Sequence, residues 1–527
     1  MRALQNTRIL DCTLRDGGYI NNWEFGEPAI RGVIDNLNDA NIDVIECGFI
    51  RNVADNPNSS VFSSTNRVSQ VIGEKKPGVL YAVMIEQHNY FPEGITPFNE
   101  DGIDIIRLTF RRNEWNDAKN TARELMQKGY KVCIQPVGTA SYDDPSLIKL
   151  LQDVNDLQPY AFYMVDTLGV MYRHEMRKFF YLIDSNLSKN ICLGFHSHNN
   201  LQMSFANAQE MIRLNKDRQI IIDSSCYGMG RGVGNLATEL IADYINNTIE
   251  QRYSLTPLLN IVDKYLMNIY ARQRWGYDLP YFLSATFKCH PNYARHLISK
   301  ETLSIEKIEK ILSLIPVDRR NEYDSALAED LYLKIQQCSV DDSKSYQFIK
   351  TRIENKQVLI LGAGASVKEH QDDLARLVKD SIVISVNYVP DWFSVNAVFV
   401  SNDKRVKTLN KDKLPIIIAT SNIKDEISNA VVFDYSSLLG EGDSSDNSGA
   451  MLIRILKKCN VKRILLAGFD GYDTNASTNF AVDAFQTALD YDTAVKRNND
   501  ISKQLTLALS GVDYEIVTPT KYQIGNL

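Results

Sequence analysis

Short apolar runs alternate with segments of helical period through the first half of the chain. Eight apolar runs lie at Arg8–Leu14, Asp43–Ile50, Gly78–Ile85, Asp104–Phe110, Lys131–Val137, Ala161–Asp166, Ile191–His198 and Gln219–Tyr227. The helical segments between them include Ala29–Asn38, Glu114–Gln127, Leu147–Leu157, His174–Leu187 and Met203–Leu214. Runs that are apolar at consecutive positions are typical of parallel strands that crossover helices cover on both faces. Because eight such units follow one another without a change of pattern, and a closed barrel takes ~250 residues, we predict an α/β fold with an N-terminal (β/α)8 TIM barrel rather than a doubly wound open sheet.

The pattern changes after the last of these runs. Helical periodicity without strands covers Thr256–Ala271, Ser304–Leu314 and Ser325–Gln337, and the charged segment Lys344–Asn355 is predicted to be a linker. A second alternating pattern then predicts helices at Gln371–Val378 and Ala450–Lys458 and strands at Val358–Leu361, Ser381–Val386, Ala397–Ser401, Pro415–Ala419, Ala430–Phe433, Arg463–Ala467 and Tyr514–Val517. We therefore predict a barrel domain at residues 1–253, a helical extension and linker at 254–349, and a Rossmann-like open α/β sheet at 350–527.

Composition narrows the classes of protein that fit this pattern. The chain has 527 residues, 44% of them hydrophobic and 23% charged, which excludes wholesale disorder. The formal net charge is −7 and no Lys/Arg-rich block occurs, which argues against a nucleic-acid-binding protein. The 8 cysteines form no CxxC pair, as is typical of free thiols in a reducing compartment. The first residues, MRALQNTRILDCTLRDGG, contain charged residues and glycines where a signal peptide would need its apolar stretch. No apolar run reaches the roughly 18 residues of a membrane helix. We therefore expect a cytoplasmic protein without a membrane span.

Two histidines end the seventh apolar run, in the segment GFHSHNN. Residues i and i+2 of a strand face the same side, so His196 and His198 can reach one ion. The carboxyl ends of barrel strands carry the active sites of this fold, and the first run delivers Arg15 and Asp16, from DCTLRDGG, to the same rim. For that pair alone, an ordinary ion pair in a strand-to-loop turn is the alternative. Together, the two segments predict a divalent-metal site with Asp16, His196 and His198 as ligands and positions open for substrate.

The eighth run leads into CYGMGRGVGN, residues Cys226–Asn235, which holds four glycines. Glycines let the backbone approach a ligand closely or let a loop move, but their spacing fits neither a P-loop nor a dinucleotide fingerprint. Asn235 has two equally weighted interpretations: a further metal ligand, or the N-cap of a helix that starts at Leu236.

The polar stretch Arg51–Arg67 follows the second run, where a lid over the barrel mouth would lie.

Six segments, in this order, resemble the DRE-TIM metallolyases, which are also called HMGL-like: DCTLRDGGY, IECGF, IQPVGTASY, VDTLG, HSHNN and GMGRGVGNLATE. That superfamily includes 4-hydroxy-2-oxovalerate aldolases, hydroxymethylglutaryl-CoA lyases and isopropylmalate synthases, and the resemblance is closest to the pyruvate-type aldolases. It implies that Asp16, His196 and His198 bind Mn²⁺ or Mg²⁺, with Asn235 available as a further ligand. It also implies that Arg15 holds the enolate oxygen. The implied activity is that of a lyase that cleaves a 4-hydroxy-2-oxo acid to pyruvate and an aldehyde, or condenses the two.

The identity of the residue that acts as general acid or base stays open. Where hydroxy-oxovalerate aldolases carry a catalytic histidine, this chain has Tyr19, whose pKa of ~10 must be lowered or whose proton must pass through water. Cys226 lies at the spacing before Asn235 at which hydroxymethylglutaryl-CoA lyases carry a catalytic cysteine, and its alternative is a small buried hydrophobic residue at a strand end. The alternative activity is an acyl-CoA-dependent synthase or lyase of the same superfamily, although no segment identifies a CoA site.

The C-terminal pattern opens with LILGAGASVKEH, whose small residues let a phosphate approach backbone N–H groups, although GAGAS lacks the full GxGxxG. With ISVNY, VFVSND and LAGFDGY it loosely resembles sialyltransferase-like and pterin-pyrophosphokinase-like proteins. The resemblance implies a site for a nucleotide or nucleotide-sugar and a role in surface-sugar metabolism. The residues that it implies for this site are Gly362, Gly364, Ser366, Asn387, Asn402, Asp403 and Asp470. The alternatives are a non-catalytic binding module and an acylating aldehyde dehydrogenase, for which the domain is short and Cys459 falls late in a helix.

The expected partners are small molecules, a 2-oxo acid and an aldehyde, together with the nucleotide or nucleotide-sugar. Neither nucleic acid nor a membrane is expected. Because many barrels of this type pair through helical extensions, we expect a homodimer formed through residues 254–345.

Overall fold

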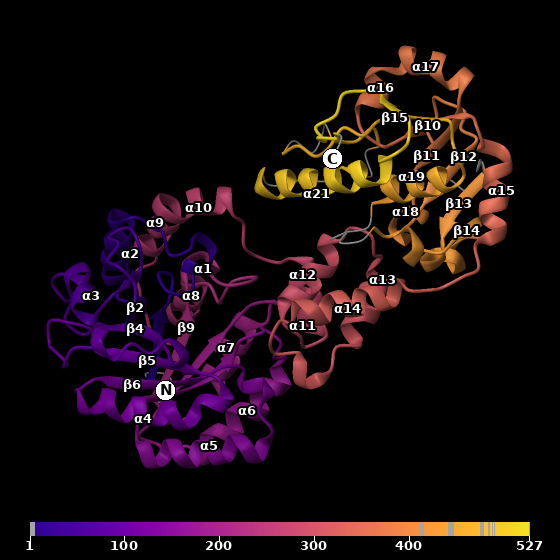
Figure 1. Cartoon of the computed structure of the whole chain (residues 1–527). Helices are drawn as coiled ribbons and strands as arrows, with labels where there is room; N and C mark the ends of the chain where they lie inside the picture. Colours follow the sequence, from indigo (N-terminus) through magenta and orange to yellow (C-terminus); the bar gives the residue numbers. More distant parts are fainter. Residues whose placement is uncertain are drawn as a thin grey trace. The chain divides into compact units, whose positions relative to one another are not determined.

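The computed structural model describes residues 6–409, 416–440, 447–474, 479–482, 485–486, 489 and 491–525. It divides into two compact units, Met1–Ala294 with Ile315–Tyr323, and Arg295–Leu314 with Asp324–Leu527. The first unit is coloured mainly indigo to magenta and the second mainly orange to yellow in Figure 1. The division lies inside the predicted helical extension, so that helices of this extension contribute to both units. The functional division into three parts stays a prediction.

Eight parallel strands close into a barrel in the first unit. They are β1 (Thr7–Asp11), β2 (Val44–Ile50), β4 (Leu80–Glu86), β5 (Ile105–Phe110), β6 (Lys131–Pro136), β7 (Ala161–Asp166), β8 (Cys192–Ser197) and β9 (Ile220–Ser224). The hydrogen-bonded order is β1-β9-β8-β7-β6-β5-β4-β2, and pairing of β1 with β2 closes the ring, while β3 (Val61–Phe62) adds to β2. The TIM barrel predicted from the sequence is confirmed, and each predicted run contains one strand.

Helices surround this ring of strands (Figure 1). They are α2 (Glu27–Asp39), α3 (Thr65–Ile72), α4 (Trp115–Gln127), α5 (Asp144–Leu157), α6 (Arg173–Asn186), α7 (Ser204–Leu214) and α8 (Thr238–Thr248), and the short α1 (Gly18–Asn21) follows β1. The stretch predicted to be a lid contains β3 and leads into α3, which Ser64 caps by accepting a hydrogen bond from the N–H of Arg67. A lid function for this stretch stays a prediction.

Alternate side chains of each strand enter the barrel, while the others pack beneath the helices. The interior side chains of the middle layer are apolar and include Leu10, Val44, Ala82, Ile105, Cys133, Ala161, Cys192 and Ile221. Two residues further along β2, β5 and β9, the same interior direction carries Glu46, Arg107 and Asp223, which are 0%, 0% and 2% exposed. The layer nearer the carboxyl ends is therefore charged, and the strands carry it toward the rim where the predicted site lies.

The predicted helices after the barrel are present. They are α9 (Leu255–Ile261), which continues through the π-turn Val262–Leu266 into α10 (Met267–Arg272), then α11 (Leu279–Thr286), α12 (Pro291–Ser299), α13 (Ile305–Ser313) and α14 (Ser325–Gln336). The linker predicted at Lys344–Asn355 is wrong, because α15 (Ser343–Ile353) occupies this segment. Its charged residues cover one side, while Ile349 and Ile353 are buried and the ring of Tyr346 packs on Phe433 at 4.8 Å. An amphipathic helix that covers a sheet needs a charged outer face, which gave the segment its linker-like composition.

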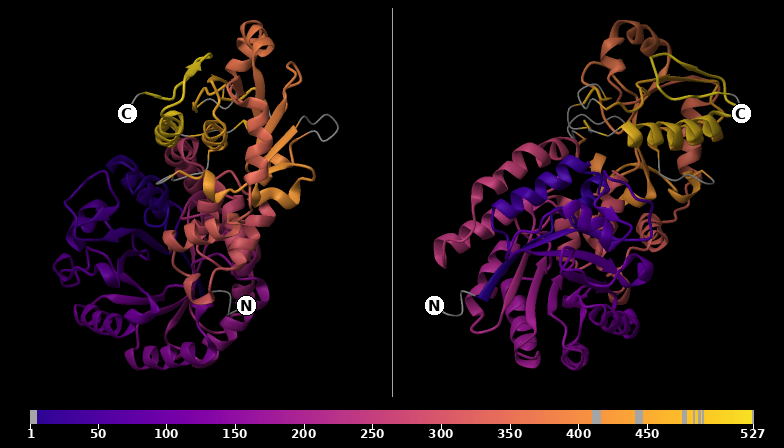
Figure 2. Two further views of the ribbon diagram at one scale, coloured as in Figure 1. Left: turned by 45° about the vertical axis from the view of Figure 1, so that its right-hand side comes forward. Right: turned by 90° about the vertical axis from the view of Figure 1, so that its left-hand side faces the viewer.

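The second unit contains an open sheet of parallel strands. In spatial order they are β14 (Val431–Phe433), β13 (Ile416–Thr420), β12 (Ala397–Val400), β11 (Ile382–Val386), β10 (Gln357–Leu361), β15 (Arg463–Ala467) and β16 (Tyr514–Ile516). Val358 and Ile360 of β10 pack in one core with α15, α19 (Ser448–Lys458) and α21 (Tyr491–Leu509), whereas Leu359 and Leu361 pack in another with α17 (Gln371–Asp380). Helices thus lie on both faces of the sheet (Figure 2), and two short helices, α16 (Ser366–Glu369) and α18 (Asp403–Val406), follow β10 and β12.

The predicted open α/β sheet is confirmed. Its predicted strand Pro415–Ala419 corresponds to β13, although Pro415 itself lies outside the described residues. The strand order reverses between β10 and β15, which pair side by side, with the edge strand β16 beyond β15. In open α/β sheets, the crevice at the carboxyl ends of such a pair is where ligands bind.

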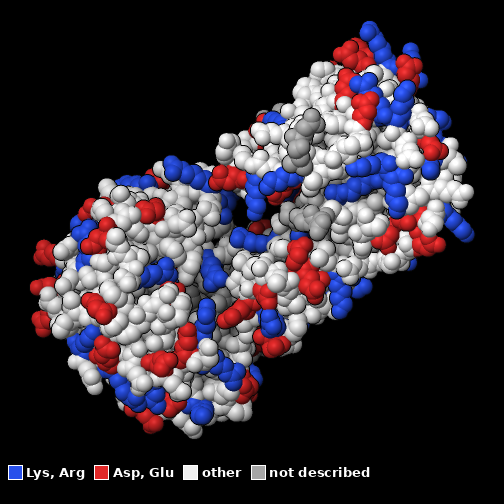
Figure 3. Space-filling model, viewed as in Figure 1, with Lys and Arg blue, Asp and Glu red and all other residues white. Residues whose placement is uncertain are grey.

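The surface carries charges of both signs. Lys/Arg and Asp/Glu side chains are interspersed on the face of the molecule shown in Figure 3. Among the helices of the described residues, none is both long enough and apolar enough to cross a membrane.

Candidate metal centre

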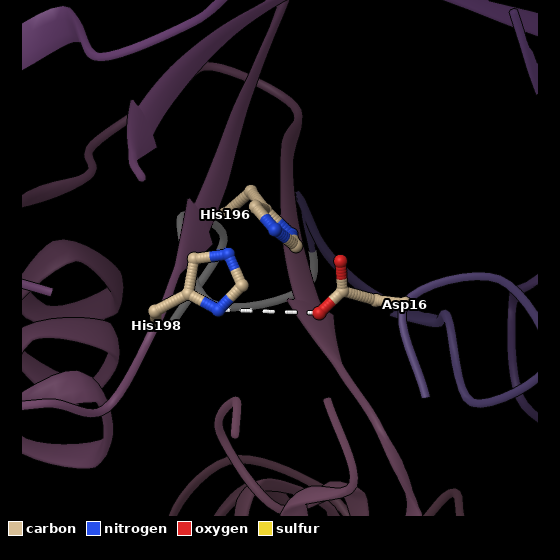
Figure 4. Close-up of side chains that lie close together, drawn as sticks. All are labelled: Asp16, His196 and His198. Carbon is tan, nitrogen blue, oxygen red and sulfur yellow. Dashed lines mark ion pairs between the residues drawn. The ribbon is translucent and has the colours of Figure 1, made fainter. Parts of the chain in front are cut away.

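Three side chains converge at the carboxyl ends of β1 and β8. His196 is on β8, His198 directly follows this strand, and Asp16 is in the loop after β1. One ligand atom from each lies within 4.8 Å of the others, and all three residues are buried. Figure 4 shows the two imidazoles and the carboxylate facing one another, with Nδ1 of His198 3.9 Å from Oδ2 of Asp16. The two sequence segments that predicted a metal site are therefore adjacent in the fold.

The electrostatics hold Asp16 and His198 in the protonation states that metal binding requires. Burial opposes ionisation of Asp16, but Arg15, the two histidines and a hydrogen bond from Asn235 outweigh it and hold the pKa of this carboxyl well below its usual range. Burial lowers the pKa of His198 to about 4, against the opposing pull of Asp16. A charged carboxylate and a neutral imidazole are the ligand forms for a divalent cation.

Two buried polar atoms at this site lack a hydrogen-bond partner among the described residues: Nδ1 of His198 and Oδ1 of Asn235. The Nδ2 of Asn235 donates to Oδ2 of Asp16 at 2.7 Å, which holds the amide of this residue beside the cluster. Buried polar atoms without a partner are costly, so their presence here fits a group that an ion would satisfy. The N-cap interpretation of Asn235 is wrong, because α8 begins at Thr238 with Ala237 in the capping position.

The glycine-rich loop brings its backbone against this cluster. The N–H of Arg231 donates to Oδ2 of Asp16 at 3.3 Å, and the N–H of Asn199 donates to the carbonyl of Gly234 at 2.9 Å. A Cβ at Gly230 would lie 2.4 Å from Nδ2 of Asn235 and 2.7 Å from Oδ2 of Asp16. Only glycine permits this approach, which explains at least one of the four glycines in the loop.

A buried charge network lies beneath the cluster, and sequence reasoning missed it. The guanidinium of Arg107 forms ion pairs with Glu46 at 2.6 Å and with Asp223. Asp223 in turn accepts a hydrogen bond from Nδ1 of His196 at 3.0 Å, which leaves Nε2 of this imidazole for a ligand position. The available signal was a charged residue inside each of three apolar strands, at the period of two that points into the barrel.

Arg15 is held by the other end of this network. Its Nε donates to Glu46 at 2.8 Å, and its Nη1 donates to Asp16. Its Nη2 is buried and has no hydrogen-bond partner among the described residues. One guanidinium N–H group is therefore available, beside the cluster, to an anionic oxygen of a bound molecule.

The two candidates for proton transfer differ in their surroundings. Burial and the charge of Asp16 raise the pKa of Tyr19, whose ring packs edge-to-face on Trp23 at 4.8 Å and lies under the guanidinium of Arg231. The thiol of Cys226 is fully buried, donates to Oδ2 of Asp11 at 3.5 Å, and has a pKa raised well above its usual value by burial and by Asp11. These surroundings support the packing interpretation of Cys226.

In the second unit, a cavity opens at the carboxyl ends of β10 and β15. Its lining includes Gly362, Gly364, Asn387 and Asp470, four of the residues predicted to bind a nucleotide. Sequence reasoning missed other lining residues, which come from distant segments: Arg405, Asn447, Ser448, Tyr472 and Tyr522.

The remaining predicted residues of this unit have other partners. The N–H of Ser366, at the start of α16, donates to Asp470 at 2.7 Å, so a carboxylate already occupies the position predicted for a phosphate. Asn402 caps α18 by accepting from the N–H of Arg405 at 3.0 Å. Asp403 accepts from the N–H of Ser304 at 3.2 Å. Neither Asn402 nor Asp403 is among the lining residues of the cavity.

Comparison with known proteins concerns the barrel. A family model described as HMGL-like matches residues 111–263, which include both histidines and Asn235. An oxaloacetate decarboxylase of Mycobacterium tuberculosis is 24% identical over 238 residues, which are 44% of this chain and 68% of that protein. A 4-hydroxy-2-oxovalerate aldolase of Thermomicrobium roseum is 26% identical over 251 residues, which are 46% of this chain and 67% of that protein.

Among solved structures, hydroxymethylglutaryl-CoA lyase from Pseudomonas aeruginosa is similar with a TM-score of 0.41 and 17% identity, covering 56% of this chain and 97% of that one. The matched family model shows that residues 111–263, which include the later strands of the barrel, are similar to the HMGL-like family, as the resemblance of the motifs in this range implied. The resemblance stated for the C-terminal segments stays a prediction.

Proposed function

We propose that this chain, with its HMGL-like domain, is a divalent-metal-dependent carbon–carbon lyase that cleaves a 4-hydroxy-2-oxo acid to pyruvate and an aldehyde, or condenses them. The observation that carries the proposal is the buried cluster of Asp16, His196 and His198, in which polar atoms remain without partners beside a free N–H of Arg15. The names of the relatives support a lyase, since one is an aldolase and another a decarboxylase.

Asp16, His196 and His198 would hold Mn²⁺ or Mg²⁺, with the oxygen of Asn235 as a further ligand. When bound, the ion would supply Lewis-acid polarisation of the 2-oxo acid. The chain's own contribution is positional. Asp223 orients His196, and Glu46 orients Arg15 so that its free N–H meets the oxygen on which negative charge develops as the carbon–carbon bond breaks.

Tyr19 is the proton donor in this proposal. Because its pKa is raised, its hydroxyl stays protonated at neutral pH and can donate to the oxygen that becomes the product hydroxyl during condensation. Tyr19 then regains a proton from water, and in the cleavage direction the same transfers run in reverse, so that the proton of that hydroxyl passes through Tyr19 to water. Cys226 takes no part, because its thiol is buried against Asp11.

Deuterium exchange into pyruvate tests the barrel's activity without knowledge of the aldehyde. The protein would be incubated with pyruvate and Mg²⁺ in D₂O, and loss of the methyl proton signal followed by NMR. We expect exchange that EDTA abolishes and that the His196→Ala variant lacks, while His370→Ala, a matched change in the second unit, leaves it intact. Metal binding without exchange would favour the acyl-CoA-dependent alternative, and absence of metal binding would contradict the proposal.

For the second unit we propose a nucleotide or nucleotide-sugar site in the cavity at β10 and β15. The cavity lies at the position where open α/β sheets bind ligands, and four of the predicted residues line it. Titration of the full chain with CMP and CDP, followed by calorimetry, should show binding that Asn387→Ala weakens and Asn402→Ala does not. No measurable affinity for either nucleotide would support the non-catalytic module instead.

A homodimer through residues 254–345 remains part of the proposal. Large apolar side chains are exposed on α9 and α11 and in the connection before α11, namely Leu259 at 54%, Tyr277 at 63%, Leu279 at 44% and Phe282 at 37%. Exposed apolar side chains that cluster along a segment are typical of contact surfaces. Light scattering that gives the mass of one chain would contradict the dimer.

A further inference from the structure

Arg231 lies in the glycine-rich loop, between two glycines, and its side chain extends away from the loop. Its backbone N–H touches the metal cluster through Asp16, as described above, but its side chain is exposed. The guanidinium carbon lies 5.7 Å from the centre of the Tyr19 ring, and Nη2 lies 3.0 Å from Nε2 of His290. The side chain therefore begins at the cluster and ends above the tyrosine that we propose as the proton donor.

The positive charge of Arg231 has no carboxylate partner in the part of the chain that the structure describes. Among the described residues, no carboxylate forms an ion pair with it, and its contacts are an aromatic ring and an imidazole. Arg15, in contrast, is paired with two carboxylates, Asp16 and Glu46. An arginine that is held in place by uncharged groups presents its N–H groups, in a fixed plane, to a carboxylate or a phosphate.

We infer that Arg231 determines substrate specificity by binding an anionic group, carboxylate or phosphate, on the aldehyde half of the substrate. The inference rests on the proposed function and refines it. In the proposed function, the ion and Arg15 hold the 2-oxo acid half of the substrate. An anion bound by Arg231 therefore belongs to the aldehyde half, and the length of the Arg231 side chain separates it from the reacting carbons. Tyr19 lies between the two ends, where the aldehyde oxygen must be. The full substrate is accordingly a 4-hydroxy-2-oxo acid with an anionic group at each end.

Two matched pairs of aldehydes test this specificity in condensation with pyruvate. Butanal and succinate semialdehyde differ by a carboxylate, while glyceraldehyde and glyceraldehyde 3-phosphate differ by a phosphate. We expect the protein to prefer one anionic member, which identifies the anion. Arg231→Gln should lower kcat/KM for that member about 10- to 100-fold and change the neutral member little, while Arg231→Lys should retain part of the preference.

Controls separate this role from a loss of the loop's structure. Arg123→Gln removes the same charge from an exposed position on α4 and should change neither pair. Arg123→Gln should also leave exchange of pyruvate protons unchanged, and in Arg231→Gln the fall in this exchange should be much smaller than the fall in kcat/KM for the anionic aldehyde, because the exchange needs no aldehyde. Equal loss for anionic and neutral aldehydes, or no preference for either anion in the unaltered protein, would overturn the inference.

The outcome can be told apart from a failure of the proposed function. If the unaltered protein exchanges pyruvate protons but Arg231→Gln shows no selective loss, the lyase proposal stands and the role of Arg231 is wrong. If the protein does not exchange pyruvate protons, calorimetric titration with succinate semialdehyde and glyceraldehyde 3-phosphate still tests the site without turnover. Weaker binding by Arg231→Gln than by Arg123→Gln then supports the anion site, and equal binding overturns it.

Discussion

One buried arginine connects the two halves of the proposed active site. Arg107 is 0% exposed and joins Glu46, which holds Arg15, to Asp223, which holds His196. Without the arginine, Glu46 would keep only Arg15 as a partner and Asp223 only the imidazole of His196, so buried negative charge would lose part of its compensation. The residue touches neither the cluster nor a substrate, so we regard it as a positioning residue that fixes both halves relative to each other.

The Arg107→Met variant should lose stability and metal affinity together. Removal of one partner from a buried ion pair costs about 3–5 kcal/mol, and loss of an outer-shell partner typically weakens metal binding about 10- to 100-fold. Urea unfolding and metal titration measure the two effects. Arg218→Met is the matched control, because Arg218 is equally buried but binds Asp184 and nearby carbonyls, away from the cluster. Wild-type metal affinity in Arg107→Met would contradict the positioning role.

His290 gives the protein a defined dependence of stability on pH. Burial, with the nearby charge of Arg231, lowers its pKa from 6.5 to about 4. Between these values the unfolded chain binds a proton that the folded chain does not, so this residue's contribution to the free energy of unfolding falls as pH falls from about 6.5 to about 4. Urea unfolding at pH 7, 6 and 5 should show a smaller loss for His290→Gln than for the unaltered protein. Identical pH profiles would show that His290 titrates normally.

At the scale of an element, the glycine-rich loop combines two functions. Gly230 brings backbone against Asp16 and Asn235, and Arg231, the next residue, extends its side chain outward. Because Gly230 has no side chain and Arg231 has a long one, the same short segment can pack against the metal cluster and also extend toward the substrate. Gly230 therefore fixes how closely the backbone of this loop can lie against the cluster.

A single methyl group on this loop should disturb the metal site. In Gly230→Ala, the added Cβ would meet Asn235 and Asp16 well inside contact distance, and the loop must move to accommodate it. We expect metal affinity to fall at least about tenfold, as for other changes that displace ligands, while the circular dichroism of the barrel is unchanged. Gly525→Ala, where a Cβ meets no atom within 4 Å and the backbone φ is not positive, should bind metal normally. Normal metal affinity in Gly230→Ala would show that the loop adapts at no cost.

The sequence predicted the barrel because eight strands are apolar at consecutive positions, a pattern that few other folds require. It predicted the cluster because its ligands lie in two short motifs at strand ends. The Arg107 network was not predicted, because its members come from β2, β5 and β9 and only closure of the barrel brings them together. Arg405, which lines the C-terminal cavity, was not predicted either, because only the folded sheet brings its segment beside β10 and β15. Ser366 was assigned to a phosphate because the sequence cannot show that Asp470, far along the chain, fills that position.

At the scale of the whole molecule, two units with separate cores carry two separate sheets. The chain passes between them more than once, since Arg295–Leu314 belongs to the second unit and Ile315–Tyr323 to the first. The metal cluster uses residues of the first unit alone, and the C-terminal cavity uses residues of the second alone. Each unit can therefore respond to its own ligand, and a metal should stabilise only the unit that binds it.

Tryptophan fluorescence can follow the barrel by itself. Of the 4 tryptophans, Trp23, Trp115 and Trp275 belong to the first unit, and Trp392 belongs to the second, so a Trp392→Phe variant reports only on the first. At a Mg²⁺ concentration of about 100 times Kd, binding to the folded state alone adds about 2.7 kcal/mol to the free energy of unfolding of that unit. Its fluorescence transition should move to higher temperature with metal, and the His196→Ala change should abolish the movement.

Calorimetry of the same samples should show a second transition that metal does not move. If metal moved both transitions equally, the two units would unfold as one, and the connections between residues 295 and 323 would couple them more tightly than their separate cores indicate.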